Sequence, residues 1–244
     1  MIEETTRYSC RSCGSTDIIR NGHNKCGNPQ YLCKECGTCR VLTPKQRYSP
    51  EQKRLILQAY RERMSLRGLQ RVFGVWRSTV LRWLRQLLEQ LPSLIQTLLP
   101  AQADDVLEMD ECMSFVTEKF FKRWLWTAMC RRTRQIVAYA IGDRSETTAR
   151  HLWDALPGPY QACPIYTDNF NVYPTFVPPD RHHPAPKGSR QTNHQERFYL
   201  TLRQWSGRYT RRTLSFSKED VYHSLVTHWF IIDHNLRMAA SRTM

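Results

Sequence analysis

Apolar side chains recur at helical spacing between residues 46 and 100. A helix is predicted to start here, with Ser49 as its N-cap, Pro50 at the first helical position and Gln52 as the capping-box partner. Ser65 can cap a second helix, which a glycine ends, and a third helix follows with leucines on its inner face. The pattern predicts three short helices in succession.

The pattern changes after residue 104, where short runs rich in branched and aromatic residues are typical of strands. Predicted strands cover residues 106–116, 124–129, 135–141 and 164–168, and predicted helices cover 146–156, 193–205 and 221–236. Pro157 and Gly158 are expected to end the first of these helices. A Pro- and His-rich loop over 174–190 has room for one short strand. This order of elements predicts a mixed α/β domain.

Composition divides the chain into three parts. The first is rich in Cys, Gly and Asn and has few large aliphatic residues, so it cannot bury much apolar surface unaided. We predict domains at 1–45, 46–100 and 101–244, with a proline-containing linker at the end of the second. No apolar run approaches the ~18 residues that span a bilayer, and no signal peptide opens the chain. We therefore expect a cytoplasmic protein.

Positive charge is concentrated in the first part of the chain. The net charge is +14, and residues 1–100 carry 17 Lys and Arg against 7 Asp and Glu, whereas the remainder carries 19 against 15. A basic segment suits a polyanionic partner, most simply nucleic acid. A solubilising surface would have the same composition, so charge alone leaves both interpretations open.

Six of the nine cysteines lie between positions 10 and 39. Cys10 and Cys13 form one C-x-x-C pair, and Cys33 and Cys36 form a second, with 19 residues between the two pairs. Two such pairs can complete a tetrahedral site for one structural Zn²⁺. Cys39 is a possible substitute for Cys36, although C-x-x-C geometry favours Cys36. The spacing therefore predicts a zinc ribbon that needs its ion to fold.

The second and third predicted helices, joined by a Gly-containing turn, have the pattern of a helix-turn-helix. In that motif the early residues of the second helix face base edges in the major groove. Trp76 stands where a capping residue is common, so the helix start is expected to shift to Ser78. The predicted DNA contacts are Arg77, Ser78, Thr79 and Arg82. A basic packing module without DNA contacts is the alternative interpretation.

Carboxylates interrupt the apolar strands at two places and begin a helix at a third. The first strand holds Glu108, Asp110 and Glu111, the fourth ends at Asp168, and Glu196 lies early in a helix. Three carboxylates from such elements can hold two Mg²⁺ ions about 4 Å apart, the arrangement that cleaves phosphodiesters. Glu108 and Asp110 share a strand face, so periodicity cannot choose between them, and Glu111 points the other way.

The order of these features resembles the insertion-sequence-one family of transposases. The resemblance rests on the cysteine pairs, the helix-turn-helix pattern, and the motifs at 108–111, 167–169, 195–197, 202–204 and 214–218. It implies an α/β, ribonuclease-H-like mixed-sheet catalytic domain after the zinc ribbon and helix-turn-helix module. It also implies a DDE triad of Asp110, Asp168 and Glu196, and so chooses Asp110 over Glu108.

The resemblance further implies a transposase that binds terminal inverted repeats, cleaves their 3′ ends and joins them to target DNA. Its cofactors would be one structural Zn²⁺ and two catalytic Mg²⁺ or Mn²⁺ ions. Its partners would be double-stranded DNA and a second copy of the chain, as a homodimer or larger synaptic assembly associated with the nucleoid. Basic side chains around the glutamate-bearing helix would contact phosphates: Arg197, Arg203, Arg208, Arg211 and Arg212.

Two other functions remain open from the residues alone. A non-catalytic, sequence-specific DNA-binding regulator would use the first two domains for recognition and the third for dimerisation. The presence of all three carboxylates disfavours it. A tyrosine recombinase would need a grouped pattern of tyrosine and arginines, and the sequence has no such group.

Overall fold

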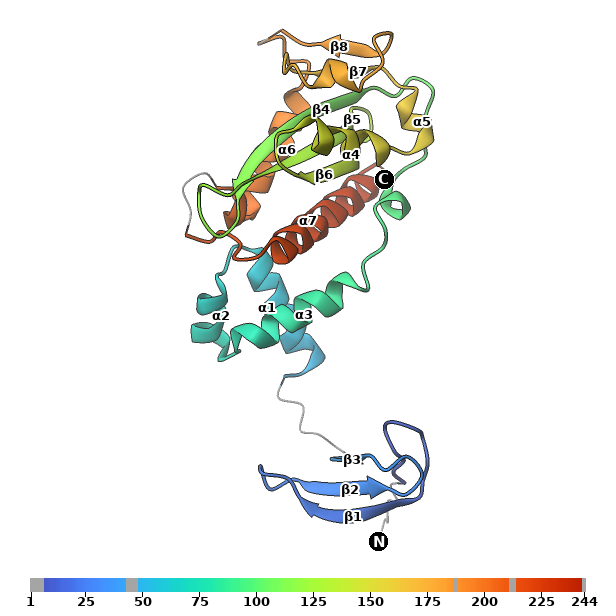
Figure 1. Ribbon diagram of the computed structural model, residues 1–244, viewed down its shortest axis with the longest axis vertical. Coiled ribbons are helices and arrows are strands. Elements are labelled where there is room, and N and C mark those ends of the chain that lie inside the picture. The colour runs from blue at the N-terminus through green and yellow to red at the C-terminus, as the bar shows by residue number, and fades with distance from the viewer. Residues whose placement is uncertain (1–6, 43–47, 187, 211–213, 243–244) are drawn as a thin grey trace. The chain divides into compact units, whose positions relative to one another are not determined.

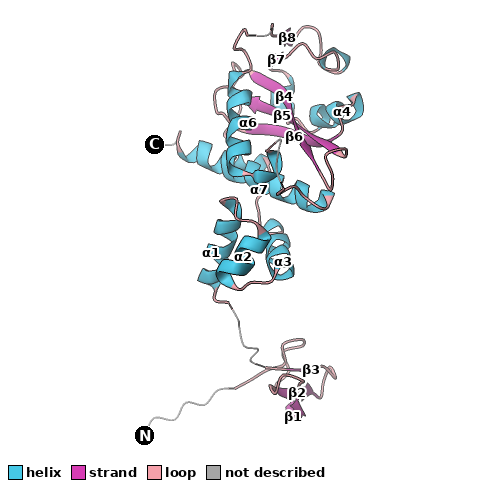
Figure 2. Cartoon of the chain, turned by 90° about the vertical axis from the view of Figure 1, so that its left-hand side faces the viewer, coloured by secondary structure: helices cyan, strands magenta, loops and turns pink. Residues whose placement is uncertain are grey.

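The computed structural model describes residues 7–42, 48–186, 188–210 and 214–242. The chain forms two compact units, with the boundary between Lys53 and Arg54. No helix within the described ranges is both long enough and apolar enough to cross a bilayer. Figures 1 and 2 show the elements of both units.

The first unit is built on a small antiparallel sheet. Its strands pair in the order β1-β2-β3, with the bounds β1 Ile18–His23, β2 Pro29–Cys33 and β3 Cys39–Arg40. Among the described hydrophobic residues of this sheet and its loops, the buried ones are two cysteines, Cys10 and Cys33. The sheet therefore has almost no apolar core, as its composition predicts.

Three helices follow, at the positions that the caps predict: α1 Pro50–Arg61, α2 Leu66–Phe73 and α3 Arg77–Leu88. The Ser49 hydroxyl accepts from the Gln52 amide at 3.1 Å, and the Gln52 side chain accepts from the Ser49 amide at 2.9 Å. Ser65 caps α2, which ends at Gly74 with a positive φ of 64°. The expected shift of the α3 start to Ser78 is wrong. Trp76 is the N-cap without a side-chain bond, because its carbonyl oxygen already accepts the first helical hydrogen bonds, from the Thr79 and Val80 amides.

The α/β part is built on a five-stranded mixed sheet in the order β6-β5-β4-β7-β8. Strands β4, β5 and β6 pair antiparallel in chain order. Strand β7 pairs parallel with β4, and β8 pairs parallel with β7. The bounds are β4 Leu107–Phe115, β5 Lys122–Cys130, β6 Ile136–Gly142, β7 Ile165–Thr167 and β8 His182–Pro184. This mixed sheet is compatible with a ribonuclease-H-like fold.

Helices cover both faces of this sheet, which Figure 2 shows from the side. Helix α4 packs on one face with Trp126 and Ile165 in its core, while α6 and α7 pack on the other with Leu125, Phe198 and Ile231. The bounds are α4 Glu146–Asp154, α5 Gly158–Gln161, α6 Asn193–Trp205 and α7 Asp220–Ala240, with 3-10 turns η1 Ile95–Thr97, η2 Tyr173–Thr175 and η3 Gly207–Tyr209.

Helix α5 corrects one sequence expectation. Helix α4 ends at Asp154, two residues before the predicted end, and Pro157 and Gly158 begin a further helical turn, with Pro157 as its N-cap. Proline close to a helix start is favoured because its missing N–H has no intrahelical partner there. A Pro-Gly-Pro run therefore separates two helices here and does not lead directly into the next strand.

Candidate functional site

Asp110 and Asp168 meet at the point where the parallel pairing of β4 and β7 ends. Leu107 pairs with Ile165 and Glu108 with Tyr166, so continuing that register by two residues brings Asp168 alongside Asp110. β7 ends at residue 167, and Asp168 follows it directly. A carboxylate oxygen of each lies within 4.8 Å of the other. Two acids that are far apart in sequence are thus brought together by strand register.

Glu111 also belongs to this acidic cluster. Its side chain leaves the opposite face of β4, as strand alternation predicts, and accepts a hydrogen bond from the Tyr173 hydroxyl at 2.8 Å and from Arg144 Nε at 2.9 Å. One Glu111 oxygen nevertheless lies within 4.8 Å of an oxygen of each aspartate, at the point where the pairing of β4 with β7 ends while its pairing with β5 continues. The sequence offers no signal for this convergence around an open edge.

Glu196 lies outside that 4.8 Å cluster of described residues. It is exposed on the first turn of α6. This helix is held against the sheet where Tyr199 donates to the Asp110 carbonyl oxygen at 2.6 Å. The negative charge of Glu196 still contributes to raising the pKa of Asp110. The three predicted acids therefore face one region, with carboxylate oxygens of two of them within 4.8 Å of each other and the third acid on a neighbouring helix.

Glu108, which periodicity could not separate from Asp110, has a different environment. Its side chain is 1% exposed and pairs with Arg131 Nε at 2.9 Å. Its other oxygen accepts from the backbone amides of His194 and Gln195. Glu108 is therefore engaged by protein groups at the start of α6, whereas Asp110 accepts only one close backbone hydrogen bond, from the Glu111 amide at 2.7 Å.

The crowding of acids perturbs their protonation. Burial, followed by the negative charge of Glu111, raises the pKa of Asp110 to about 8, and Asp168 and Glu196 add to the rise. Burial likewise raises the pKa of Glu111, although Tyr173 and Arg144 oppose the change. A cluster of carboxylates that repel one another is stabilised by a divalent cation, and oxygen ligands suit Mg²⁺ and Mn²⁺.

We expect divalent-ion affinity at this cluster to depend on pH. Below pH 8 Asp110 holds a proton that the ion must displace, so apparent affinity falls about tenfold for each pH unit lost; above pH 8 it levels off. Calorimetric titration with Mn²⁺ between pH 6.5 and 9 measures this, with release of about one proton per ion at pH 7. An affinity that is constant over this range contradicts the assignment of Asp110 as a ligand.

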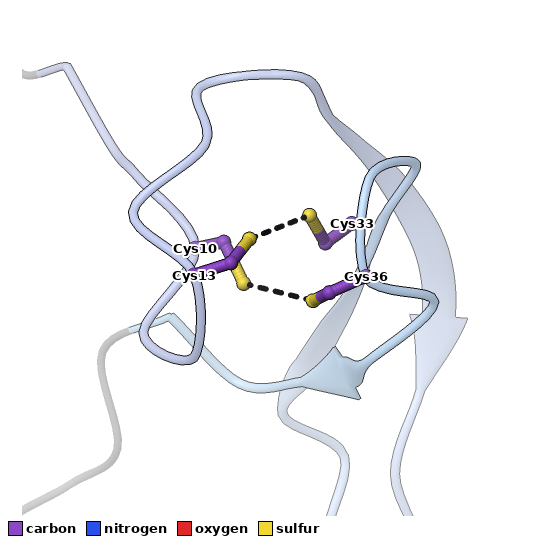
Figure 3. A group of neighbouring side chains, drawn as sticks. All are labelled: Cys10, Cys13, Cys33 and Cys36. Carbon is purple, nitrogen blue, oxygen red and sulfur yellow. Dashed lines mark hydrogen bonds between the residues drawn. The ribbon is translucent and has the colours of Figure 1, made fainter.

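The four predicted cysteine ligands converge in the first unit (Figure 3). Cys10 Sγ lies 3.6 Å from Cys36 Sγ, and Cys13 Sγ lies 3.5 Å from Cys33 Sγ. Four sulfurs bonded to one ion at about 2.3 Å lie roughly 3.8 Å apart at the corners of a tetrahedron. The cluster thus has the spacing of a four-thiolate zinc site, with all four Sγ atoms within 4.8 Å of one another.

Local structure around the cysteines supports the same ligand set. Gly14 and Gly37 have φ angles of 78° and 67°, the left-handed conformation that a knuckle turn needs. The Thr38 hydroxyl, which lies 3.3 Å from Cys36 Sγ, lowers the pKa of the Cys36 thiol to about 6 and favours its thiolate form. Cys39 lies outside the cluster, with its sulfur 3.3 Å from the Asn21 amide.

The predicted DNA contacts occupy several environments. Arg77, Ser78 and Arg82 are exposed on α3, whereas Thr79 is half-buried. Arg197 is exposed beside Glu196. The Arg203 guanidinium instead lies against the sheet, 3.3 Å from Cys112 Sγ. Arg211 and Arg212 lie outside the described residues.

Arg208 lines a basic cavity within the second unit. It hydrogen-bonds Ser217 and the Tyr60 hydroxyl, and burial lowers its pKa to about 10. The cavity measures about 620 Å³, and none of the described residues lining it is acidic. Its basic lining residues are Arg61, Arg63, Arg67, Arg77, Arg208 and Lys218. A concave basic surface of this kind attracts phosphates.

Comparison with known proteins places these features in a family. The family model for IS1 transposase matches residues 105–237, which include the whole acidic cluster. The InsB protein of insertion element iso-IS1n from Shigella dysenteriae is 36% identical over 129 residues, covering 53% of this chain and 95% of that protein. An InsB protein of insertion element IS1 from Escherichia coli K12 is 32% identical over 128 residues, covering 52% of this chain and 74% of that protein.

Proposed function

This chain belongs to the IS1 transposase family, and on that premise we propose that it binds the terminal inverted repeats of an insertion sequence, cleaves their 3′ ends and joins those ends to target DNA. The approach of Asp110 and Asp168 across two parallel strands is the observation that carries the proposal. A regulator that only bound DNA would gain nothing from placing repelling carboxylates together at a sheet edge.

Asp110, Asp168 and Glu196 would hold the catalytic ions. When bound, two Mg²⁺ or Mn²⁺ ions would activate the attacking oxygen and stabilise the leaving oxygen of a phosphodiester. Water would attack the phosphorus at the element end and release the 3′-OH as leaving group. That 3′-OH would then attack a phosphodiester of target DNA and release the 3′-hydroxyl of the target strand, both steps being in-line displacements. Asp110 would give up its proton on binding an ion, and Arg144 and Tyr173 hold the neighbouring Glu111 in place.

DNA recognition would use the helices, the cysteine cluster and the basic cavity together. We propose that α3 enters the major groove as the second helix of a helix-turn-helix, presenting Arg77, Ser78 and Arg82. The cysteine cluster would bind Zn²⁺ and hold the small sheet in a shape that adds to end recognition. Arg208 and its cavity would receive backbone phosphates. Two element ends must be held together for joining, so we propose a homodimer or larger assembly.

The test is incubation of the full chain with labelled element ends in Mg²⁺ or in EDTA. We expect nicks at the 3′ termini that require Mg²⁺ and disappear in EDTA. End binding is compared in Mg²⁺ and in buffer without added divalent ions, where it should be retained, because EDTA would also remove the Zn²⁺ that end recognition needs. Binding without any nick would favour the regulator. Cleavage that persists in EDTA, or a covalent phosphotyrosyl–DNA adduct, would reject the metal-dependent mechanism.

A further inference from the structure

Helix α6, which carries Glu196, begins without a cap of its own. The first four backbone N–H groups of any α-helix have no partner within the helix. A side chain at the N-cap usually accepts from one of them, but Thr192 at this position makes no such bond. The start of α6 therefore depends on an acceptor from another part of the chain.

That acceptor is Glu108 on strand β4. One of its carboxylate oxygens accepts from the His194 amide at 3.1 Å and from the Gln195 amide at 3.2 Å. Its other oxygen accepts from Arg131, which also donates to the Gln191 carbonyl oxygen at 2.7 Å, just before the helix. A negative charge at this end also suits the helix dipole.

This cap links the positions of two of the three proposed catalytic acids, Asp110 and Glu196. Glu108 lies two residues before Asp110, which is about 7 Å along a strand, and Glu196 follows the capped Gln195 directly. The Gln195 side chain donates to the Thr127 carbonyl oxygen at 2.7 Å and ties the same turn to strand β5. The buried Glu108 carboxylate thus ties the first amides of α6 to the strand that carries Asp110, one turn before Tyr199 contacts the same strand.

We propose that Glu108 is a positioning residue. By fixing the first turn of α6 relative to β4, it places Glu196 where it can share an ion with Asp110 and Asp168. This inference rests on the proposed function of that site. Glu108 is not itself a metal ligand, because protein donors occupy both of its oxygens and its side chain is 1% exposed. It acts through the helix, and its loss removes the two hydrogen bonds that tie the His194 and Gln195 amides to β4.

Glu108→Gln tests this role, with Glu118→Gln as the matched control. Glu118 is an exposed acid just beyond the far end of the same strand. We expect Glu108→Gln to lose amide-exchange protection at His194 and Gln195. Cleavage turnover and Mn²⁺ affinity should each fall tenfold or more, the usual effect of losing a group that orients a ligand. Element-end binding should stay within twofold. Glu108→Asp, which keeps the charge, should recover part of both losses, and the control should change neither.

Unchanged Mn²⁺ affinity and turnover in folded Glu108→Gln would overturn the proposal, even with exchange protection lost. If that variant does not fold, the rates of amide exchange in the parental chain test whether Glu108 caps α6. His194 and Gln195 should exchange about a hundredfold more slowly than Asn193, which has no such acceptor, and Mg²⁺ should slow them further. Equal rates at the three amides, or no effect of Mg²⁺, would overturn it. Mn²⁺ affinity and amide exchange do not require DNA cleavage, so failure of these two readouts is distinct from failure of the proposed transposase activity.

Discussion

Asp110→Asn is expected to reduce Mg²⁺-dependent cleavage of element ends at least a thousandfold while leaving end binding within about twofold. The substitution keeps the size of the side chain and removes the charge that a divalent ion needs. A thousandfold loss corresponds to about 4 kcal/mol of transition-state stabilisation, which is within reach of a lost metal ligand. Asp168→Asn is expected to behave in the same way because the two carboxylates share one cluster.

Glu196→Gln and Glu111→Gln together test which glutamate completes the site. We expect the cleavage rate of the Glu196 variant to fall as far as that of the aspartate variants. The cleavage rate of the Glu111 variant should fall only about tenfold, because Tyr173 and Arg144 already bind the Glu111 oxygens. Gel assays of labelled ends measure cleavage and binding on the same samples. Asp104→Asn, an exposed acid before β4, is the control. Parental cleavage rates in Asp110→Asn or Asp168→Asn would show that the active site lies elsewhere.

Cys33→Ser is expected to remove zinc and sequence-specific end binding together. The small sheet buries little besides Cys10 and Cys33, so the free energy of zinc binding, on the order of 10 kcal/mol in comparable sites, has to stabilise its fold. We expect the first unit to unfold while the α/β part keeps its thermal transition, because that part has its own apolar core. The zinc content measured by mass spectrometry should fall from one ion per chain to none.

Cys26→Ser is the matched control for this prediction. Cys26 lies in the same small unit, is exposed, and stands outside the four-cysteine cluster. Its replacement should leave the zinc content and end binding unchanged. A folded parental protein that binds ends with clearly less than one zinc per chain would contradict the four-thiolate site.

Local signals in the sequence located the elements well because their causes lie within a few residues. Ser49 and Gln52 exchange hydrogen bonds across a single turn, and Gly74 ends α2 because glycine adopts positive φ readily. The start of α3 was missed because no side-chain cap marks it: the Trp76 backbone carbonyl accepts the first helical hydrogen bonds without help from a capping side chain. Cysteine spacing similarly predicted which four sulfurs converge, because each C-x-x-C pair is formed by one local turn.

The acidic site was only partly accessible from the sequence. The alternation of β4 identified Glu108 and Asp110 as sharing a face but could not separate them, and only the family resemblance chose Asp110. The convergence of Glu111 with the two aspartates required knowing that β7 ends at Thr167 and leaves the edge of β4 open.

By itself the amino-acid sequence determined the order and type of most elements, which four cysteines converge and the family, because these follow from contacts between near neighbours and from motif spacing. The tertiary structure alone decided the environment of each acid. Register between β4 and β7 aligns Asp110 with Asp168, and the packing of α6 makes Glu108 a helix cap. Hydrogen bonds between segments distant in the chain set these environments, and no pattern within either segment encodes them.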